Sequence, residues 1–143
     1  MTNPVAPHPT RVGVLLSRST TTGWLDWMHG EMWLFEDGIL RIPVGWIQTI
    51  LCVGYFFNPQ KQVTRSFTAD DFARLLSDRR VRWIPRDKLA SAELRHTIGA
   101  DELRAQLIDG QQVQLLWLQQ DGAYYALQQP LWQWVGHWLT VID

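Results

Sequence analysis

The spacing of apolar residues near the end of the chain predicts an amphipathic helix. Between Gly122 and Leu139, large apolar side chains recur at steps of three and four, the period of a helix, at Tyr124, Leu127, Leu131, Trp134 and Trp138. Val135 widens this stripe. Pro130 removes one backbone donor, so the helix either kinks there or ends near Gln129 and restarts at Pro130. In both cases we expect the stripe to close one end of a small β core.

A hairpin is predicted around the loop Glu36-Asp37-Gly38, between two runs of alternating residues. Gly38 favours a three-residue loop, because such loops place a left-handed residue at that point. The resulting register sets Leu34 opposite Leu40 on an inner face. It sets Trp33 opposite Arg41 on a half-exposed outer face, where a ring and a guanidinium would pair.

A second group of strands is predicted over residues 90–95, 103–107 and 113–117, where apolar and polar residues alternate. The length of the loop around Gly110 decides which face is buried. A two-residue loop would set Ala105 and Leu107 opposite glutamines, whereas a three-residue loop through Gln111 sets them opposite apolar partners. We therefore expect Leu103, Ala105 and Leu107 to point inward, and Arg104 and Gln106 outward.

Shorter signals complete the pattern. Residues 12–16 form a candidate first strand, and residues 45–57 a buried strand before a loop. Thr68 followed by Asp71 resembles a capping box and predicts a helix over residues 70–78. Residues 83–85 then lead into the second group of strands.

The order of these elements, strands and hairpins first and one amphipathic helix last, resembles a pleckstrin-homology (PH)-like barrel. The segments GEMWLFEDGILRIPVGW, WIPRDKLASAELRH and DELRAQLIDGQQVQLLWL are similar to the PH-like (GRAM-type) small proteins of actinobacteria. The resemblance covers residues 27–138, apart from an insertion at about 49–82. It implies an α+β fold, a barrel or two near-orthogonal antiparallel sheets capped by a C-terminal helix, with a short helix in the insertion. The domain would span residues 12–143, after a flexible lead-in at residues 1–11.

Composition narrows the function. The chain has 143 residues, a net charge of −1 and one cysteine, Cys52. A near-neutral chain is a poor nucleic-acid binder, since phosphate neutralisation requires a basic excess. The single cysteine, the absence of a secretory signal pattern and an apolar run too short to span a bilayer (44–57) predict a cytoplasmic protein.

No pattern of residues predicts chemistry. The histidines, His8, His29, His96 and His137, are not spaced as metal ligands. The chain has no G-x-S-x-G elbow and no phosphate-binding glycine loop, and Cys52 has no basic neighbour in the sequence. We therefore expect neither an enzyme, nor a cofactor, nor a metal.

Two surfaces are candidates for binding. Aromatic and apolar residues outside the main stripe, Tyr125, Trp132 and Leu139, together with Trp33, would bind a protein partner or a second copy. The alternative for the helix flank is that the insertion, with Leu116 and Leu118, covers it. The second surface is a basic region with one ring, Arg79, Arg80, Arg82, Trp83, Arg86 and Lys88. It is either a solvated helix end or a site for an anionic membrane surface.

The PH-like resemblance also has a limit. PH domains that bind phosphoinositides carry basic residues around the first hairpin, whereas this chain has Glu36 and Asp37 there, with only Arg41 nearby. An acidic turn repels phosphate, so inositide binding is not expected at that place.

Overall fold

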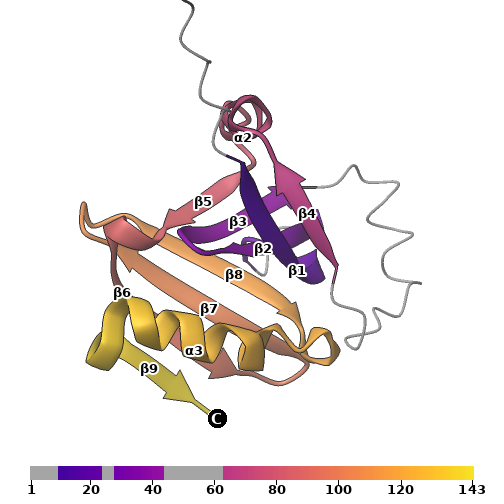
Figure 1. Ribbon diagram of the computed structural model, residues 1–143. Helices are drawn as coiled ribbons and strands as arrows, with labels where there is room; N and C mark the ends of the chain where they lie inside the picture. Colours follow the sequence, from indigo (N-terminus) through magenta and orange to yellow (C-terminus); the bar gives the residue numbers. More distant parts are fainter. Residues whose placement is uncertain (1–9, 24–27, 44–62) are drawn as a thin grey trace, which may run out of the picture.

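The computed structural model describes residues 10–23, 28–43 and 63–143 (Figure 1). In these residues the chain forms nine strands and two α-helices, which confirms the predicted α+β class. The strands are β1 (Arg11–Thr20), β2 (Gly30–Phe35), β3 (Gly38–Pro43), β4 (Thr64–Phe67), β5 (Arg82–Pro85), β6 (Leu89–His96), β7 (Ala100–Leu107), β8 (Gln112–Leu118) and β9 (Leu139–Ile142). The helices are α2 (Ala69–Leu76) and α3 (Ala123–Val135).

The strands form two sheets. The first has the order β4-β1-β2-β3-β5 and is antiparallel, and the second has the order β8-β7-β6-β9, in which only the β6–β9 pair is parallel. An isolated antiparallel bridge joins Thr21, after β1, to Leu116 of β8. The two backbone hydrogen bonds of this bridge measure 2.8 and 2.9 Å. The sheets therefore meet at one corner without merging into a single closed ladder in the described residues.

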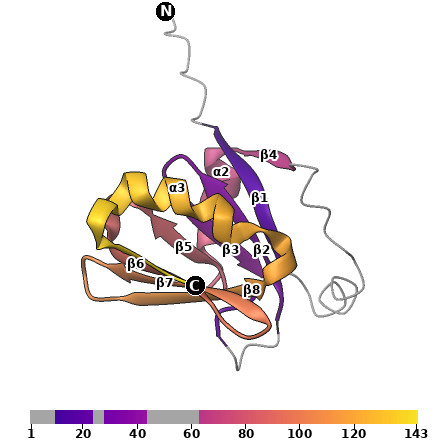
Figure 2. The same ribbon diagram turned by 90° about the horizontal axis from the view of Figure 1, so that it is seen from below.

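The main core lies between the two sheets and α3, which lies along the second sheet in Figures 1 and 2. Met32, Ile39 and Ile84 come from the first sheet, and the second sheet contributes the inward residues of β6, β7 and β8. The helix contributes Tyr124, Leu127 and Leu131, which are 1%, 0% and 0% exposed. The predicted helical stripe is thus confirmed for these three residues.

A second core covers the opposite face of the first sheet. It contains Leu15, Trp33, Phe35, Leu40, Phe67 and Phe72, the last from α2. Its rings meet edge to face, with centroids 5.3 Å apart for Phe35 and Phe67 and 4.9 Å for Phe72 and Trp83. The capping box predicted for this helix is confirmed, since Thr68 and Asp71 each accept a hydrogen bond from the other's backbone. The hydrogen bond from the Thr68 side chain is the main reason that the pKa of Asp71 lies below its usual value.

The first hairpin differs from the prediction. Its turn has two residues, Glu36 and Asp37, so Trp33 lies opposite Leu40 and not opposite Arg41. Gly38 belongs to β3, where an added Cβ would lie 2.4 Å from the Trp83 ring and 2.5 Å from the Ile84 carbonyl. The glycine therefore serves a close approach and not a left-handed turn, and this is why the predicted loop was one residue too long.

The shifted register buries both residues of the predicted outer pair. Trp33 is 3% exposed, within the second core, and Arg41 is 2% exposed. The Arg41 guanidinium donates to the backbone carbonyls of Arg80, Thr20 and Met28. The predicted half-exposed pair is wrong, and neither residue is available to a partner.

The β7–β8 hairpin confirms the predicted faces. Leu103, Ala105 and Leu107 are buried, while Arg104 and Gln106 are exposed. The loop has three residues, 108–110, one position before the predicted one, and Gly110 adopts the left-handed conformation with φ of 88°. The odd loop length was the decisive feature, since it preserves the parity of the two strands.

The C-terminus departs from a single long helix. α3 runs through Pro130, so no new helix begins there, and it ends at Val135, followed by Gly136, whose φ is 56°. The residues that follow form a short 3₁₀ turn and then β9, which was not predicted. Trp138 is therefore 62% exposed and not part of the buried stripe, and Trp134 is only half-buried. Leu139 lies in β9 and packs against the main core.

The predicted insertion contributes to the domain where it is described. β4 pairs with β1, and α2 carries Phe72 into the second core. The predicted lead-in reaches one residue into β1, which begins at Arg11. The predictions for His8, Cys52 and residues 45–62 fall outside the described residues.

Candidate functional site

The outer face of α3 is an exposed, uncharged surface. Tyr125 is 70% exposed and Trp132 is 59% exposed. Ala126, Gln129 and Gln133 are also exposed, and none of the 13 residues of α3 is charged. We call Tyr125, Ala126, Gln129, Trp132 and Gln133 the outer stripe. A helix face exposed only to water normally carries charges, so these residues are unusual for a solvated surface.

The buried side of α3 fixes the position of the outer stripe. Tyr124 stacks on His96 at a centroid distance of 3.7 Å, and its hydroxyl donates to Asp143 at 2.7 Å. Burial is the main cause that raises the pKa of Tyr124 to about 12, so this donor stays protonated. Since Tyr125 and Trp132 are seven residues apart, they lie about 10.5 Å apart along the axis on one side of the helix.

The structure brings together only two of the four predicted partner-binding residues. Tyr125 and Trp132 share the outer stripe, whereas Trp33 is buried in the second core and Leu139 is half-buried in β9. Leu139 lies away from the outer stripe because residues 136–139 form a 3₁₀ turn and the start of β9 and not a continuation of the helix, and Trp33 is buried because of the hairpin register.

The predicted basic residues do not form one surface. Arg80 is paired with Asp78 at 2.9 Å, and this hydrogen bond raises the pKa of Arg80 and lowers that of Asp78. Arg79 lies in the exposed segment after α2. Arg82 lines a cavity on the second sheet, which is described below. The basic side chains are thus divided between separate parts of the molecule.

The remaining predicted residues, Trp83, Arg86 and Lys88, line a shallow cavity of about 440 Å³. Arg11, Asp37 and Asp87 line the same cavity. Asp37 is paired with Arg11 at 3.0 Å, and the two carboxylates offset part of the positive charge of the cavity. The Trp83 ring packs edge to face on Phe72, so it is chiefly a member of the second core.

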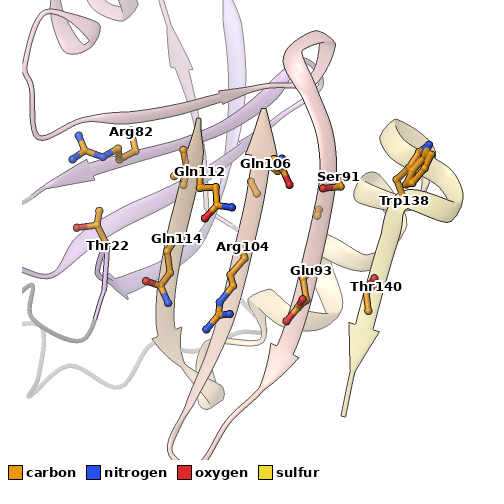
Figure 3. A pocket seen from close by; sticks show the side chains of 13 residues that line it. Thr22, Arg82, Ser91, Glu93, Arg104, Gln106, Gln112, Gln114, Trp138 and Thr140 are labelled. Atoms are coloured by element: carbon orange, nitrogen blue, oxygen red, sulfur yellow. The ribbon is translucent and has the colours of Figure 1, made fainter. Parts of the chain in front are cut away.

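A feature that the sequence did not single out is the hollow outer face of the second sheet (Figure 3). Its cavity of about 700 Å³ is lined by Thr22, Arg82, Ser91, Ala92, Glu93, Arg104, Ala105, Gln106, Gln112, Val113, Gln114, Trp138 and Thr140. The alternation of residues predicted which side chains of these strands point outward. It did not predict that these side chains lie together as a possible binding site. The available signal was the unusual choice of amides, Gln106, Gln112 and Gln114, where charged residues are common on a solvated face.

Other site classes receive no support from the described residues. No group of three histidine, cysteine, aspartate or glutamate side chains in residues 10–23, 28–43 and 63–143 is placed to hold a metal ion. Within the same ranges, no helix has both the length and the apolar character needed to cross a membrane. Comparison with protein-family models and with curated proteins gives no match for this chain.

Proposed function

We propose that this protein is a non-catalytic interaction module that associates with a second copy of itself through the outer stripe of α3. The observation that carries the proposal is the exposure of Tyr125 and Trp132 on a helix with no charged residue. Aromatic residues are enriched, and charged ones depleted, in the centres of protein interfaces. The PH-like resemblance implies in general a role in binding lipid head groups, peptides or partner domains, and this proposal belongs to the last of these classes.

The composition of the stripe favours a second copy over an unlike partner. When two α3 helices pack antiparallel about a twofold axis, Tyr125 of one copy faces Trp132 of the other, and the reverse contact forms by symmetry. Gln129 then lies near the axis, where its amide can donate to and accept from its own counterpart. No like charges oppose each other in this arrangement, because α3 carries none.

Sedimentation velocity over a range of protein concentrations tests the proposal. The wild-type chain is expected to form a reversible dimer, and Trp132→Ala to remain monomeric with an unchanged melting temperature. Trp138→Ala is the matched control, because Trp138 is equally exposed, 62% against 59%, but lies outside α3. It is expected to dimerise like the wild type. A wild-type chain that stays monomeric at high concentration would overturn self-association, as would a dimer unaffected by Trp132→Ala.

Cross-linking tests the symmetry of the pair. In a Cys52→Ser background, Gln129→Cys is expected to form a disulfide-linked dimer under mild oxidation, because the two copies meet at this residue. An exposed position away from the stripe, Ile108→Cys, is expected to give none. Equal cross-linking at both positions would contradict the antiparallel arrangement.

Recruitment to an anionic membrane through the Arg79–Lys88 region is the second candidate, and it receives less support. The basic residues are divided, and Asp37 and Asp87 lie beside Arg86 and Lys88. Cosedimentation with phosphatidylserine vesicles is expected to show no binding. Binding that is lost in Arg86→Ala would reverse this ranking.

A further inference from the structure

We propose that the outer face of the second sheet binds a neutral oligosaccharide, in a site distinct from the outer stripe of α3. The lining side chains come in rows that cross the sheet. Thr140, Glu93, Arg104 and Gln114 are successive register partners on β9, β6, β7 and β8. Ser91, Gln106 and Gln112 form a second row beside them. Because directly paired residues share a face, both rows point into the same hollow, as Figure 3 shows.

A buried carboxylate in the next row of the same face fixes the orientation of two of these side chains. Glu102 is 2% exposed and accepts hydrogen bonds from Arg104 Nε and, at 2.8 Å, from Gln114 Nε2. The first of these bonds raises the pKa of Arg104. Since Nε is bonded to Glu102, the two terminal nitrogens of Arg104 remain for a ligand, and the Gln114 amide oxygen remains as an acceptor. These two side chains are therefore held in place before any ligand arrives, which reduces the entropy cost of binding.

The charge of the hollow favours a neutral ligand. Arg82, Arg95 and Arg104 contribute three positive charges, and Glu93 and Glu102 contribute two negative ones. Glu93 is also paired with Arg95 at 2.7 Å. Two of the three arginines are thus paired with glutamates, so a phosphate or carboxylate ligand would gain less attraction here than at sites where arginines act without acidic neighbours.

The chemical groups match a polyhydroxylated ligand. The amides of Gln106, Gln112 and Gln114 each combine donors and an acceptor in one plane, as a pair of neighbouring hydroxyls requires. Trp138 stands at one border of the face in Figure 3, and Arg82 and Thr22 at the other. The exposed ring of Trp138 offers a flat apolar surface for the C–H face of a sugar. Purely apolar ligands do not fit, because they would leave these polar groups unpaired.

The width of the sheet indicates the size of the ligand. Four strands with a separation of about 4.8 Å span about 14 Å from β9 to β8, room for a short oligosaccharide and more than a single sugar needs.

A glycan array that contains neutral, sulfated and phosphorylated oligosaccharides tests the proposal, followed by calorimetric titration of the strongest neutral glycan. The wild-type protein is expected to bind neutral glycans. Trp138→Ala and Gln112→Ala are each expected to weaken binding by about tenfold, the effect of losing one good contact. Both side chains are exposed, so their removal leaves the fold intact. Arg104 is not a suitable test position, because its replacement would leave the buried Glu102 without a cation.

Trp132→Ala is the control, because it removes an equally exposed tryptophan from the outer stripe and is expected to leave glycan affinity unchanged. Trp132→Ala is thus the test variant for self-association and the control for glycan binding, and Trp138→Ala is the reverse. Failure of one proposal is therefore distinguishable from failure of the other. Absence of binding to every neutral glycan would overturn the proposal. Binding confined to sulfated or phosphorylated glycans, or binding unaffected by Trp138→Ala and Gln112→Ala, would do so as well.

Discussion

At the scale of single residues, one buried carboxylate links the two sheets. Asp121 follows β8, is 6% exposed, and accepts hydrogen bonds from Ser17 at 2.6 Å and from Ser19 at 2.5 Å, both on β1. Ser19 also accepts the backbone N–H of Leu118 at 3.0 Å. Burial raises the pKa of Asp121, and the two serines and the nearby His29 oppose this shift only in part.

The raised pKa predicts how stability depends on pH. Folding favours the protonated form of Asp121, so its contribution is fully present below the unfolded-state pKa of about 3.9 and is lost as pH rises through the raised folded-state value. Asp121→Asn removes this titration and retains an oxygen for the serines. We therefore expect the variant's free energy of unfolding to rise relative to that of the wild type between pH 4 and pH 7. Urea denaturation at several pH values measures this difference, and a constant or falling difference would contradict it.

At the scale of elements, the sequence pattern predicts structure where one face of an element is buried and the other is exposed. β7 and β8 have one face in the core and one toward the hollow, so alternation and loop parity identified Leu103 and Arg104 correctly. β2 and β3 lie between two cores, and apolar residues occupy both faces, so the pattern contained no information on register. The misplacement of Trp33 and Arg41 follows from this.

The remaining errors have physical causes of the same kind. β9 is four residues long and is stabilised by its parallel pairing with β6, a long-range contact that no local pattern encodes. β4 is equally short, and the residues before its last are exposed, so it lacks an apolar signature. The hollow on the second sheet was not predicted, because it depends on which outward residues become neighbours across four strands.

The capping box of α2 gives a prediction at this scale. Thr68 accepts the N–H of Asp71 at 3.1 Å, satisfying one of the free donors of the first turn. We expect Thr68→Ala to lower the free energy of unfolding by about 1 kcal/mol and Thr68→Ser to have little effect, because serine retains the acceptor. Guanidinium denaturation of the two variants measures the difference. Equal stability of Thr68→Ala and the wild type would show that this cap does not stabilise α2.

At the scale of the whole molecule, the first sheet connects the two cores. β2 and β3 place Met32 and Ile39 in the main core and Trp33, Phe35 and Leu40 in the second. Here the two cores pack on opposite faces of the same sheet, so disruption of one core removes the packing that holds the sheet against the other. We infer that the described domain folds as one cooperative unit, as expected for a chain of this size.

This cooperativity predicts that a destabilising substitution in either core lowers the stability of the whole domain. Phe35→Ala empties the centre of the second core and is expected to cost about 3–5 kcal/mol, and Leu131→Ala in the main core about 2–5 kcal/mol. In both variants, far-ultraviolet circular dichroism and tryptophan fluorescence should give one coincident unfolding transition. Ile108→Ala, at a loop position 69% exposed, is the control and should change neither probe. The decisive measurement is amide hydrogen exchange in Phe35→Ala: if α3 and the second sheet keep wild-type protection while β1–β4 and α2 lose it, the two cores are independent units.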